Sequence, residues 1–329
     1  MRFLHRRQFL HLATGTAALP AFARIARAQA YPTRPITLVL PFAAGGGADV
    51  VLRIMAERMR TFLGQTVIIE NVSGANGNIG TSRVFRAAPD GYTLGAGNWG
   101  THVGNGAIYA LPYNVLGDFE PVALHQIFYY VLAVRKALPA NNLKELIAWL
   151  KANPGKASLG TAGVGNQGHL AGILFQKLTG TSFQHVPYRG AGPAIQDLIA
   201  GQIDLVFGDP SIVPAVRTGS VKAIAVTAKQ RLPAVPDIPT AEESGLAGFV
   251  FANWVGIFAP KGTPKDIVGM FNTAVMGTLA DPTIRSRLID LGVEIPSRDQ
   301  QTPEGFAALQ KTDVEQWWPI IMATNIKPE

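Results

Sequence analysis

The sequence contains no cysteine in its 329 residues. Disulfide bonds, thiol catalysis and Cys-ligated zinc or iron–sulfur sites are therefore excluded. The sequence also lacks Gly-x-Ser-x-Gly, Gly-Lys-Ser/Thr and His-Glu-x-x-His, the motifs of common hydrolases, phosphate-binding loops and zinc proteases. Without disulfides the fold depends on its hydrophobic core, and a chain of this length is long enough to bury one.

Excess positive charge is also absent once an N-terminal leader is set aside. Residues 1–30 hold five of the 29 Lys and Arg residues and none of the 22 Asp and Glu residues, so the remaining chain carries a net charge of +2. The pI of 9.7 therefore reflects mainly the leader. No dense Lys/Arg stripe follows it, and we expect no nucleic-acid partner.

The leader has the three parts of an export signal. Residues 1–7 are basic, residues 9–23 are mostly apolar, and residues 28–30 have the small-x-small form of a signal-peptidase site. The Arg6-Arg7 pair lies just before the apolar segment, which predicts a twin-arginine-type signal peptide at residues 1–30 and a periplasmic protein. An ordinary secretory signal with an accidental Arg pair is the alternative. A membrane anchor is disfavoured because a spanning helix needs roughly 20 apolar residues.

Strand and helix patterns alternate along the rest of the chain, which predicts an α/β fold with parallel strands. Two long apolar runs, at residues 122–134 and 249–260, are suited to cross between two sheets. We therefore expect two lobes hinged by two crossing strands, each lobe a doubly wound sheet flanked by helices. The first lobe would comprise residues 31–126 and 254–329, and the second residues 127–253.

A glycine-rich segment lies between the first predicted strand and the first predicted helix. The strand covers residues 36–40, and the helix follows from Val51, Met55, Met59 and Phe62, which recur at the spacing of one helical face. The intervening residues 41–49 read PFAAGGGAD. Glycine lets a ligand approach the free N–H groups of a helix N-terminus, where the helix dipole favours an anion. The segment therefore predicts a site for a carboxylate or phosphate.

Several motifs, taken in order, resemble those of the extracytoplasmic solute receptors of tripartite tricarboxylate transport systems, the Bug family. Beside residues 41–49 they are YPTRPI at 31–36, ENVSGANGNIG at 70–80, PDGYTL at 89–94, HLAG at 169–172, HVPYRG at 185–190 and GQID at 201–204. The resemblance covers nearly the whole chain after the leader. It implies the two-lobed periplasmic-binding-protein fold, of a type II-like topology, with the ligand between the lobes.

The resemblance also implies which residues bind the ligand. The loop of residues 42–47 would hold one ligand carboxylate through backbone amides and bound waters, and Asp49 would either order the ligand or only cap its helix. Thr101, Thr161 and Asn166 offer hydrogen-bond donors, and His169 is either a ligand contact or a structural histidine. The complete candidate set is Phe42, Ala44, Gly45, Gly46, Asp49, Thr101, Thr161, Asn166, His169, Tyr188 and Asp209.

Three further residues of this region have roles that the sequence leaves open. Trp99 would be a core residue more readily than a platform for a ligand ring, and Arg189 a solvated surface residue more readily than a carboxylate partner. The family usually places an Asp directly after the residue equivalent to Phe207, whereas Gly208 intervenes here. Whether Asp209 contacts a ligand hydroxyl or amine is therefore undecided.

These observations predict a monomeric periplasmic receptor that captures a small carboxylate and delivers it to membrane transporter subunits. The solute would be a di- or tricarboxylate, an amino acid or an aromatic acid. We expect no cofactor, no metal site and no catalysis. The alternatives are an exported hydrolase or isomerase acting on an organic acid, and a ligand sensor for a membrane receptor kinase.

Overall fold

The computed structural model describes residues 31–323. The predicted export signal at residues 1–30 lies outside this range. Among the helices of residues 31–323, none has both the length and the apolar character needed to cross a membrane.

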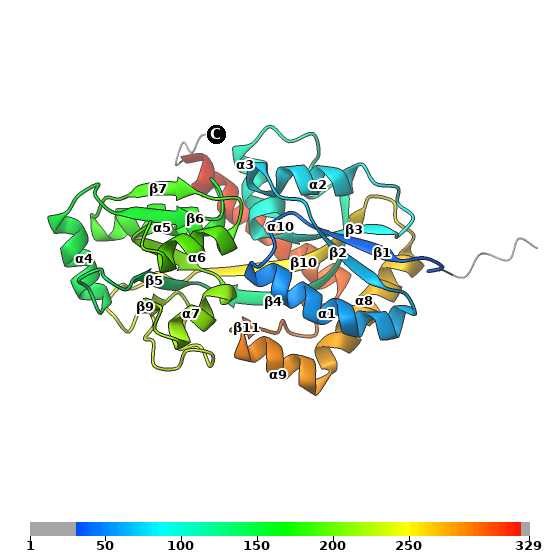
Figure 1. Cartoon of the computed structure of the whole chain (residues 1–329). Helices are drawn as coiled ribbons and strands as arrows, with labels where there is room; N and C mark the ends of the chain where they lie inside the picture. The colour runs from blue at the N-terminus through cyan, green and yellow to red at the C-terminus, as the bar shows by residue number, and fades with distance from the viewer. Residues whose placement is uncertain (1–30, 324–329) are drawn as a thin grey trace, which may run out of the picture.

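The first sheet has six strands in the order β11-β4-β10-β3-β1-β2. It forms the core of one lobe, at the right of Figure 1. Its strands are β1 (Ile36–Leu40), β2 (Val67–Asn71), β3 (Thr93–Asn98), β4 (Phe119–Tyr129), β10 (Ala252–Pro260) and β11 (Val293–Glu294).

The second sheet has five strands in the order β7-β6-β8-β5-β9 and forms the core of the other lobe. Its strands are β5 (Val131–Arg135), β6 (Ser158–Thr161), β7 (Gln184–Pro187), β8 (Leu205–Gly208) and β9 (Val221–Val226).

Helices flank both sheets. The first lobe carries α1 (Gly47–Leu63), α2 (Asn78–Phe85), α3 (Asn105–Ile108), α8 (Lys265–Ala280), α9 (Pro282–Asp290) and α10 (Pro303–Ala323). The second lobe carries α4 (Leu143–Ala152), α5 (Gln167–Thr179), α6 (Ala191–Ile199) and α7 (Val213–Arg217). Three single turns complete the description, at Ala75–Gly77, Gly100–Gly104 and Pro210–Ile212.

Two crossings join the lobes. β4 continues into β5 with only Tyr130 between them, and β10 returns the chain to the first sheet. Figure 1 shows β4 and β10 running from one lobe toward the other. The predicted two-lobed α/β fold is thereby confirmed. The lobe bounds predicted at residues 126 and 254 lie within β4 and β10.

Both sheets are mixed rather than wholly parallel, which differs from the expectation. β1 is parallel to β2 and β3, and β6 is parallel to β7 and β8. β10 is antiparallel to β3, and β5 is antiparallel to β8. The parallel strands end at the cleft, whereas a strand that arrives from the other lobe begins there. Its direction is therefore reversed.

The first helix follows its predicted pattern except at one residue. Val51, Met55 and Met59 have no exposed surface, whereas Phe62 is 42% exposed. In the last turn of α1 it is Leu63, 4% exposed, that is buried in place of Phe62. The Phe62 ring contacts the α8 backbone around Gly277 on one side and lies 5.2 Å from the Arg58 guanidinium carbon.

Glycine and asparagine residues define several helix ends. Gly64 ends α1 with a φ of +66°, a conformation in which glycine has no steric penalty. Asn142 caps α4, and its side chain accepts a hydrogen bond from the Glu145 N–H. Asn166 caps α5 in the same way and accepts from the His169 N–H. This last cap places a side chain of the second lobe at the cleft.

Candidate functional site

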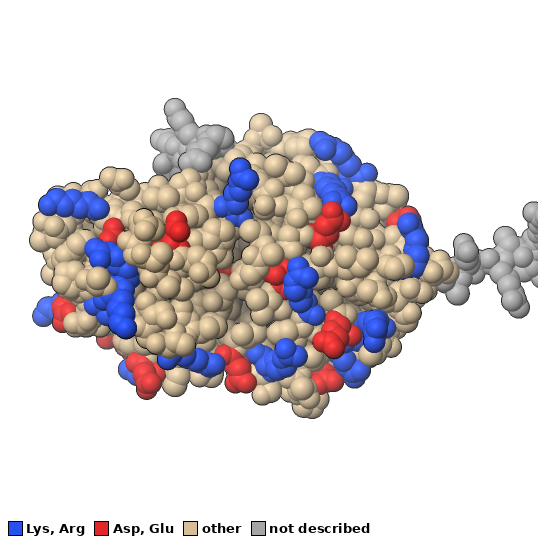
Figure 2. Space-filling view, in the orientation of Figure 1, with Lys and Arg blue, Asp and Glu red and all other residues tan. Residues whose placement is uncertain are grey.

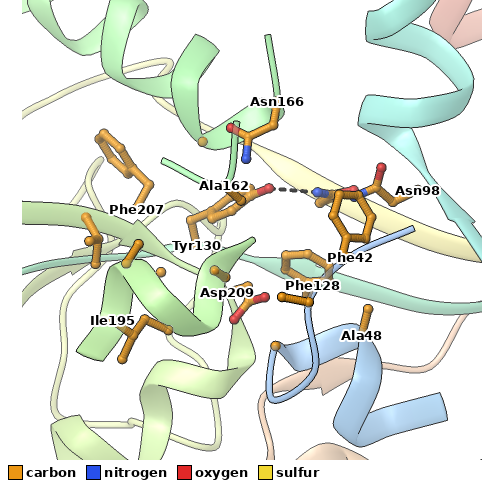
Figure 3. Close-up of a pocket in the computed structure, with 18 of the residues that line it drawn as sticks. Phe42, Ala48, Asn98, Phe128, Tyr130, Ala162, Asn166, Ile195, Phe207 and Asp209 are labelled. Atoms are coloured by element: carbon orange, nitrogen blue, oxygen red, sulfur yellow. Dashed lines mark hydrogen bonds between the residues drawn. The ribbon is translucent and has the colours of Figure 1, made fainter. Parts of the chain in front are cut away.

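A cavity lies between the lobes, where β1, β3, β6 and β8 end. Such strand ends gather the loops that lead into helix N-termini, and ligands of open α/β sheets bind there. The cavity volume is about 60 Å³, several times the roughly 10–15 Å³ that one water requires. Figure 2 shows the hollow between the lobes from outside, and Figure 3 shows its lining.

The lining combines aromatic rings, amide side chains and two acids, without any Lys or Arg. The rings are those of Phe42, Phe128, Tyr130 and Phe207, the amides are Asn98, Asn166 and Asn253, and the acids are Asp49 and Asp209. A ligand anion would therefore be bound by neutral donors. Such donors hold a buried carboxylate without requiring a fixed buried positive charge.

The loop from β1 to α1 supplies backbone donors to the cavity. Gly46 is the N-cap of α1, and both Gly46 and Ala48 line the cavity. The Ala48 N–H lies in the first helical turn, where no intrahelical acceptor exists. The Gly47 N–H beside it donates to Asp209 Oδ2 of the other lobe at 3.1 Å. The helix N-terminus therefore already interacts with one carboxylate, and it keeps a further N–H at the cavity.

The Asp49 side chain fixes the conformation of this loop through hydrogen bonds. Its carboxylate accepts hydrogen bonds from the Gly45 N–H at 3.0 Å, from Asn71 Nδ2 at 3.0 Å and from Arg53 Nε at 3.0 Å. Burial by itself would raise the pKa of Asp49, but the hydrogen bonds from Arg53, the Gly45 N–H and Asn71 outweigh it and lower the pKa. Asp49 therefore remains ionised and fixes the loop.

The Asp49→Asn variant should be less stable than the parent by about 1.5–3 kcal/mol at neutral pH, the usual contribution of a hydrogen bond to a charged group. Because the pKa of Asp49 is lowered in the folded state, its contribution exists above the unfolded pKa and is lost as the pH falls through the folded pKa. Urea unfolding of both proteins should therefore show a difference that shrinks in acid.

A matched control is Asp266→Asn, which removes an exposed first-turn acid from α8. It should change stability by no more than about 0.5 kcal/mol. A difference for Asp49→Asn that persists unchanged in acid would contradict the role of its ionised form.

Two asparagine side chains, one from each lobe, present NH2 groups to the cavity. Asn98 Oδ1 accepts from the Thr101 N–H at 3.0 Å, and Asn166 Oδ1 accepts from the His169 N–H at 2.7 Å. Each carbonyl oxygen is held by a backbone N–H, so the orientation of each amide is determined. Neither Nδ2 donates to another group within residues 31–323. In Figure 3 the Asn166 nitrogen points into the cavity.

The crossing strands add a polar pair at the base of the cavity. Asn253 of β10 donates from Nδ2 to the Tyr130 hydroxyl at 2.7 Å, and its Oδ1 has no partner among the described residues. Burial raises the pKa of Tyr130, so its hydroxyl remains protonated. Because Tyr130 joins β4 to β5, this pair lies where the two lobes are connected.

Asp209 lies opposite the α1 N-terminus, in the turn that follows β8. Its Oδ1 accepts from the Ser211 N–H at 3.0 Å and from the Ser211 hydroxyl. Burial raises the pKa of Asp209, against the opposing effect of the hydrogen bonds from Ser211 and Gly47. The Gly47–Asp209 hydrogen bond and the bond from the Tyr109 hydroxyl to the Val164 carbonyl at 3.0 Å both cross the cleft.

Around the cavity the lobes approach each other mainly through glycine. A Cβ added at Gly192, in the first turn of α6, would lie 3.5 Å from the Ala44 carbonyl oxygen of the other lobe. At Gly190 it would lie 3.4 Å from Ala43, and at Gly163 it would lie 2.7 Å from Asn76 Oδ1. At Gly192 the lobes therefore approach each other through main-chain atoms, whereas Gly163 faces the Asn76 side chain.

Comparison with known proteins assigns the chain to a family. The model of the tripartite tricarboxylate transporter family receptor matches residues 51–326. The chain belongs to this receptor family. The resemblance to the Bug family is thereby confirmed.

Three solved structures are similar to the receptor over most of its length. The periplasmic binding protein BugD is 39% identical with a TM-score of 0.86, and the match covers 91% of this chain and 100% of BugD. MatC from Rhodopseudomonas palustris, solved with malate, is 39% identical with a TM-score of 0.84, covering 88% of this chain and all of that chain. An R. palustris protein solved with adipate is 32% identical, with a TM-score of 0.86 and coverage of 91% and 100%. The receptor is therefore a solute-binding protein rather than an enzyme.

The receptor brings five of the predicted site residues to the central cavity, namely Phe42, Gly46, Asp49, Asn166 and Asp209. Six others do not line it: Ala44, Gly45, Thr101, Thr161, His169 and Tyr188. Ala44 and Gly45 belong to the loop that faces the other lobe. Which of these residues contact a solute remains a prediction.

Some residues outside the lining support it instead. The fully buried Thr101 hydroxyl bonds the Asn98 backbone and so helps to orient Asn98. His169 Nδ1 accepts from the Gly165 N–H at 2.8 Å and so holds the turn before Asn166. Burial and the neighbouring His185 lower the pKa of His169 to about 4, which leaves its Nδ1 free to accept at neutral pH.

The remaining predicted residues of the receptor lie elsewhere. Thr161 ends β6 and is buried, and the Tyr188 hydroxyl donates to Asp197 at 2.6 Å. Trp99 is 1% exposed and packs edge-on against Trp317 in the core. Tyr188 and Arg189 line a second cavity beside the first. Within residues 31–323 no cluster of three or more His, Asp or Glu residues is arranged to hold a metal ion.

Sequence analysis did not select Asn98, Tyr130 or Asn253. Asn253 is the one amide in the apolar run at residues 249–260, which is a signal that a polar contact is needed there. The Gly-x-Gly-x-x-Gly spacing at Gly163, Gly165 and Gly168 was also overlooked. In the receptor Gly163 and Gly165, with φ of +137° and +77°, allow the turn before α5 to approach the other lobe closely.

Proposed function

We propose that this receptor is a periplasmic protein that binds a small organic acid in the central cavity and delivers it to the membrane subunits of a tripartite tricarboxylate-type transporter. The observation that carries the proposal is the pair of free amide donors, Asn98 from one lobe and Asn166 from the other. With the Ala48 N–H they provide neutral donors on both sides of one small space. A carboxylate has acceptor sites enough to use several of them together.

The relatives support this choice of solute. MatC was solved with malate and a second R. palustris protein with adipate, and both are small carboxylic acids. Asp209 adds a preference to the proposal. Its carboxylate lines the cavity without a basic partner. A solute that also carries a hydroxyl or ammonium donor would satisfy it better than one that presents only acceptors.

Binding would be coupled to closure of the lobes. The solute contacts Asn98 and Asn166 at once only when the lobes are closed, so its interaction energy favours the closed state. Closure would use the β4–β5 and β10 crossings as hinges. The receptor would act as a monomer, and the twin-arginine route would export it. Small-angle X-ray scattering should show compaction when a bound acid saturates the protein.

The proposal is tested by a thermal-shift panel on purified residues 31–329, unfolded and refolded to remove any retained solute. The panel contains citrate, succinate, malate, glutamate, terephthalate and protocatechuate. An acid at 100-fold over its dissociation constant should stabilise the fold by about 2.7 kcal/mol, a shift of a few degrees for a protein of this size. The methyl ester of that acid should give no shift.

The result separates the candidate functions. A shift that survives esterification, or the absence of any shift, would contradict carboxylate binding. Crosslinking of the loaded receptor in native membranes should capture an integral transporter subunit, whereas capture of a receptor kinase would favour the sensor function.

A further inference from the structure

The lobes also approach each other on the side of the crossing strands that faces away from the central cavity. Side chains alternate along the β4–β5 connection, so that Phe128 and Tyr130 line the central cavity whereas Tyr129, between them, lines a separate one. This rear cavity has a volume of about 480 Å³ and shares no lining residue with the central cavity. Its walls come from residues 228–233 of the second lobe and from α9 and β11 of the first.

Beside the rear cavity one side chain forms hydrogen bonds with both lobes. Arg217, the last residue of α7, donates from Nε at 3.1 Å and from Nη2 at 3.0 Å to the Ala234 carbonyl of its own lobe. The same Nη2 donates to the Asp290 carbonyl of the other lobe at 3.1 Å. Both α7 and α9 lie at the lower side of Figure 1. The guanidinium thus connects α9 to the loop that follows β9.

The Asp290 carbonyl is a favourable acceptor for a cation. Asp290 is the last residue of α9, and the last carbonyls of a helix lack intrahelical partners and lie at the negative end of the helix dipole. The lobes are also close here, since a Cβ added at Gly292 would lie 3.5 Å from the Ala234 Cβ. A movement that separates the lobes at this place would break the bond, because an N–H···O contact of about 3.6 Å is no longer a hydrogen bond.

We propose that Arg217 is a closure latch: its bond to the Asp290 carbonyl is made when the lobes are closed, and it stabilises that state without touching the solute. Arg217 lines neither cavity of the cleft. The assignment rests on the proposed function and adds to it a determinant of affinity that lies outside the binding site. A change in the population of the closed state alters the apparent affinity of every solute by the same factor. The latch therefore acts on all bound acids alike.

The Arg217→Met variant tests the latch, because methionine keeps much of the aliphatic stem and removes the charge and the donors. Calorimetry on the refolded protein should show about 5- to 10-fold weaker binding of each acid of the thermal-shift panel that binds the parent, the effect of losing one hydrogen bond from a charged group at an exposed site. Stopped-flow measurements should show faster release and an unchanged association rate, because the latch forms after the solute has entered. Arg217→Lys, which keeps the charge and a donor, should lose less.

The control variant is Arg287→Met, which removes an exposed arginine from the last turn of the same helix, α9. Within residues 31–323 the Arg287 side chain makes no hydrogen bond to the second lobe. This variant should therefore keep the parental affinities and rates, and both methionine variants should melt within a few degrees of the parent.

The outcomes separate the latch from the receptor function. Unchanged or tighter binding in Arg217→Met, or a loss confined to one acid, would overturn the latch and leave the receptor function intact. An equal loss in Arg217→Met and Arg287→Met would show a general effect of charge and would overturn it as well. Failure of every acid to bind the parent would overturn the proposed function together with the latch.

Discussion

The Gly192→Val variant should bind its acid about 100-fold more weakly than the parent, or not at all. A Cβ at this position already lies 3.5 Å from the Ala44 carbonyl oxygen and 3.6 Å from the Gly45 carbonyl carbon. The γ-methyl groups of valine extend about 1.5 Å further and would overlap the opposing loop. This overlap would hold the lobes apart and prevent full closure. The solute would then lose its contacts with one lobe.

Gly192→Ala provides the matched control. Its Cβ fits at ordinary van der Waals distance, and alanine favours a helix over glycine by up to about 1 kcal/mol. This variant should keep the parental affinity and melt at the same temperature or slightly higher. Calorimetry with the best acid of the panel, combined with X-ray scattering, checks both variants. Compaction of the valine variant to the parental radius would contradict the predicted block.

The second large effect is expected for Asn166→Asp, which should reduce carboxylate affinity about 100-fold or more. Aspartate retains the oxygen that caps α5 through the His169 N–H, and the two residues are equivalent as N-caps. It replaces the NH2 donor with a negative oxygen that faces the solute carboxylate. Repulsion in a partly buried site then opposes binding and leaves the helix intact.

Two measurements separate this effect from damage to the fold. The melting temperature of ligand-free Asn166→Asp should match that of the parent. The affinity loss should also diminish in mild acid, because protonation of the new carboxyl restores a donor. An affinity equal to the parental one at neutral pH would show that Asn166 does not contact the solute, and the proposed function would lose its main support.

The sequence predicted the elements of the fold because each carries a local signal. The apolar face of α1, the Gly64 stop and the Asn142 cap depend on residues within one or two turns of the chain. The direction of β5 and β10 was not predicted, since it depends on where a crossing strand enters the other lobe. The sequence also does not show which side chains of β4 lie on each face of the sheet. The pairing of β4 with β10 is irregular near Gly256, and such an irregularity interrupts the simple alternation of faces.

Only part of the candidate site could be predicted from the sequence. The loop after β1 could be predicted as an anion site because glycines before a helix have a physical meaning in any sequence. Asn98 could not be chosen over Thr101 from the sequence, because both follow the same strand. Only the three-dimensional hydrogen bonds show that Thr101 holds the Asn98 backbone while the Asn98 amide faces the cavity.

The contact of the lobes through Gly163, Gly190 and Gly192 has a consequence for how this receptor can change over time. Beside the cavity the lobes approach each other closely at these glycines, whereas side chains such as those of Asn98 and Phe207 line the cavity itself. After gene duplication, substitutions among those side chains could change the bound solute while the glycine contacts between the lobes are kept. The residues that would select the solute are therefore different from the glycines that allow the lobes to approach.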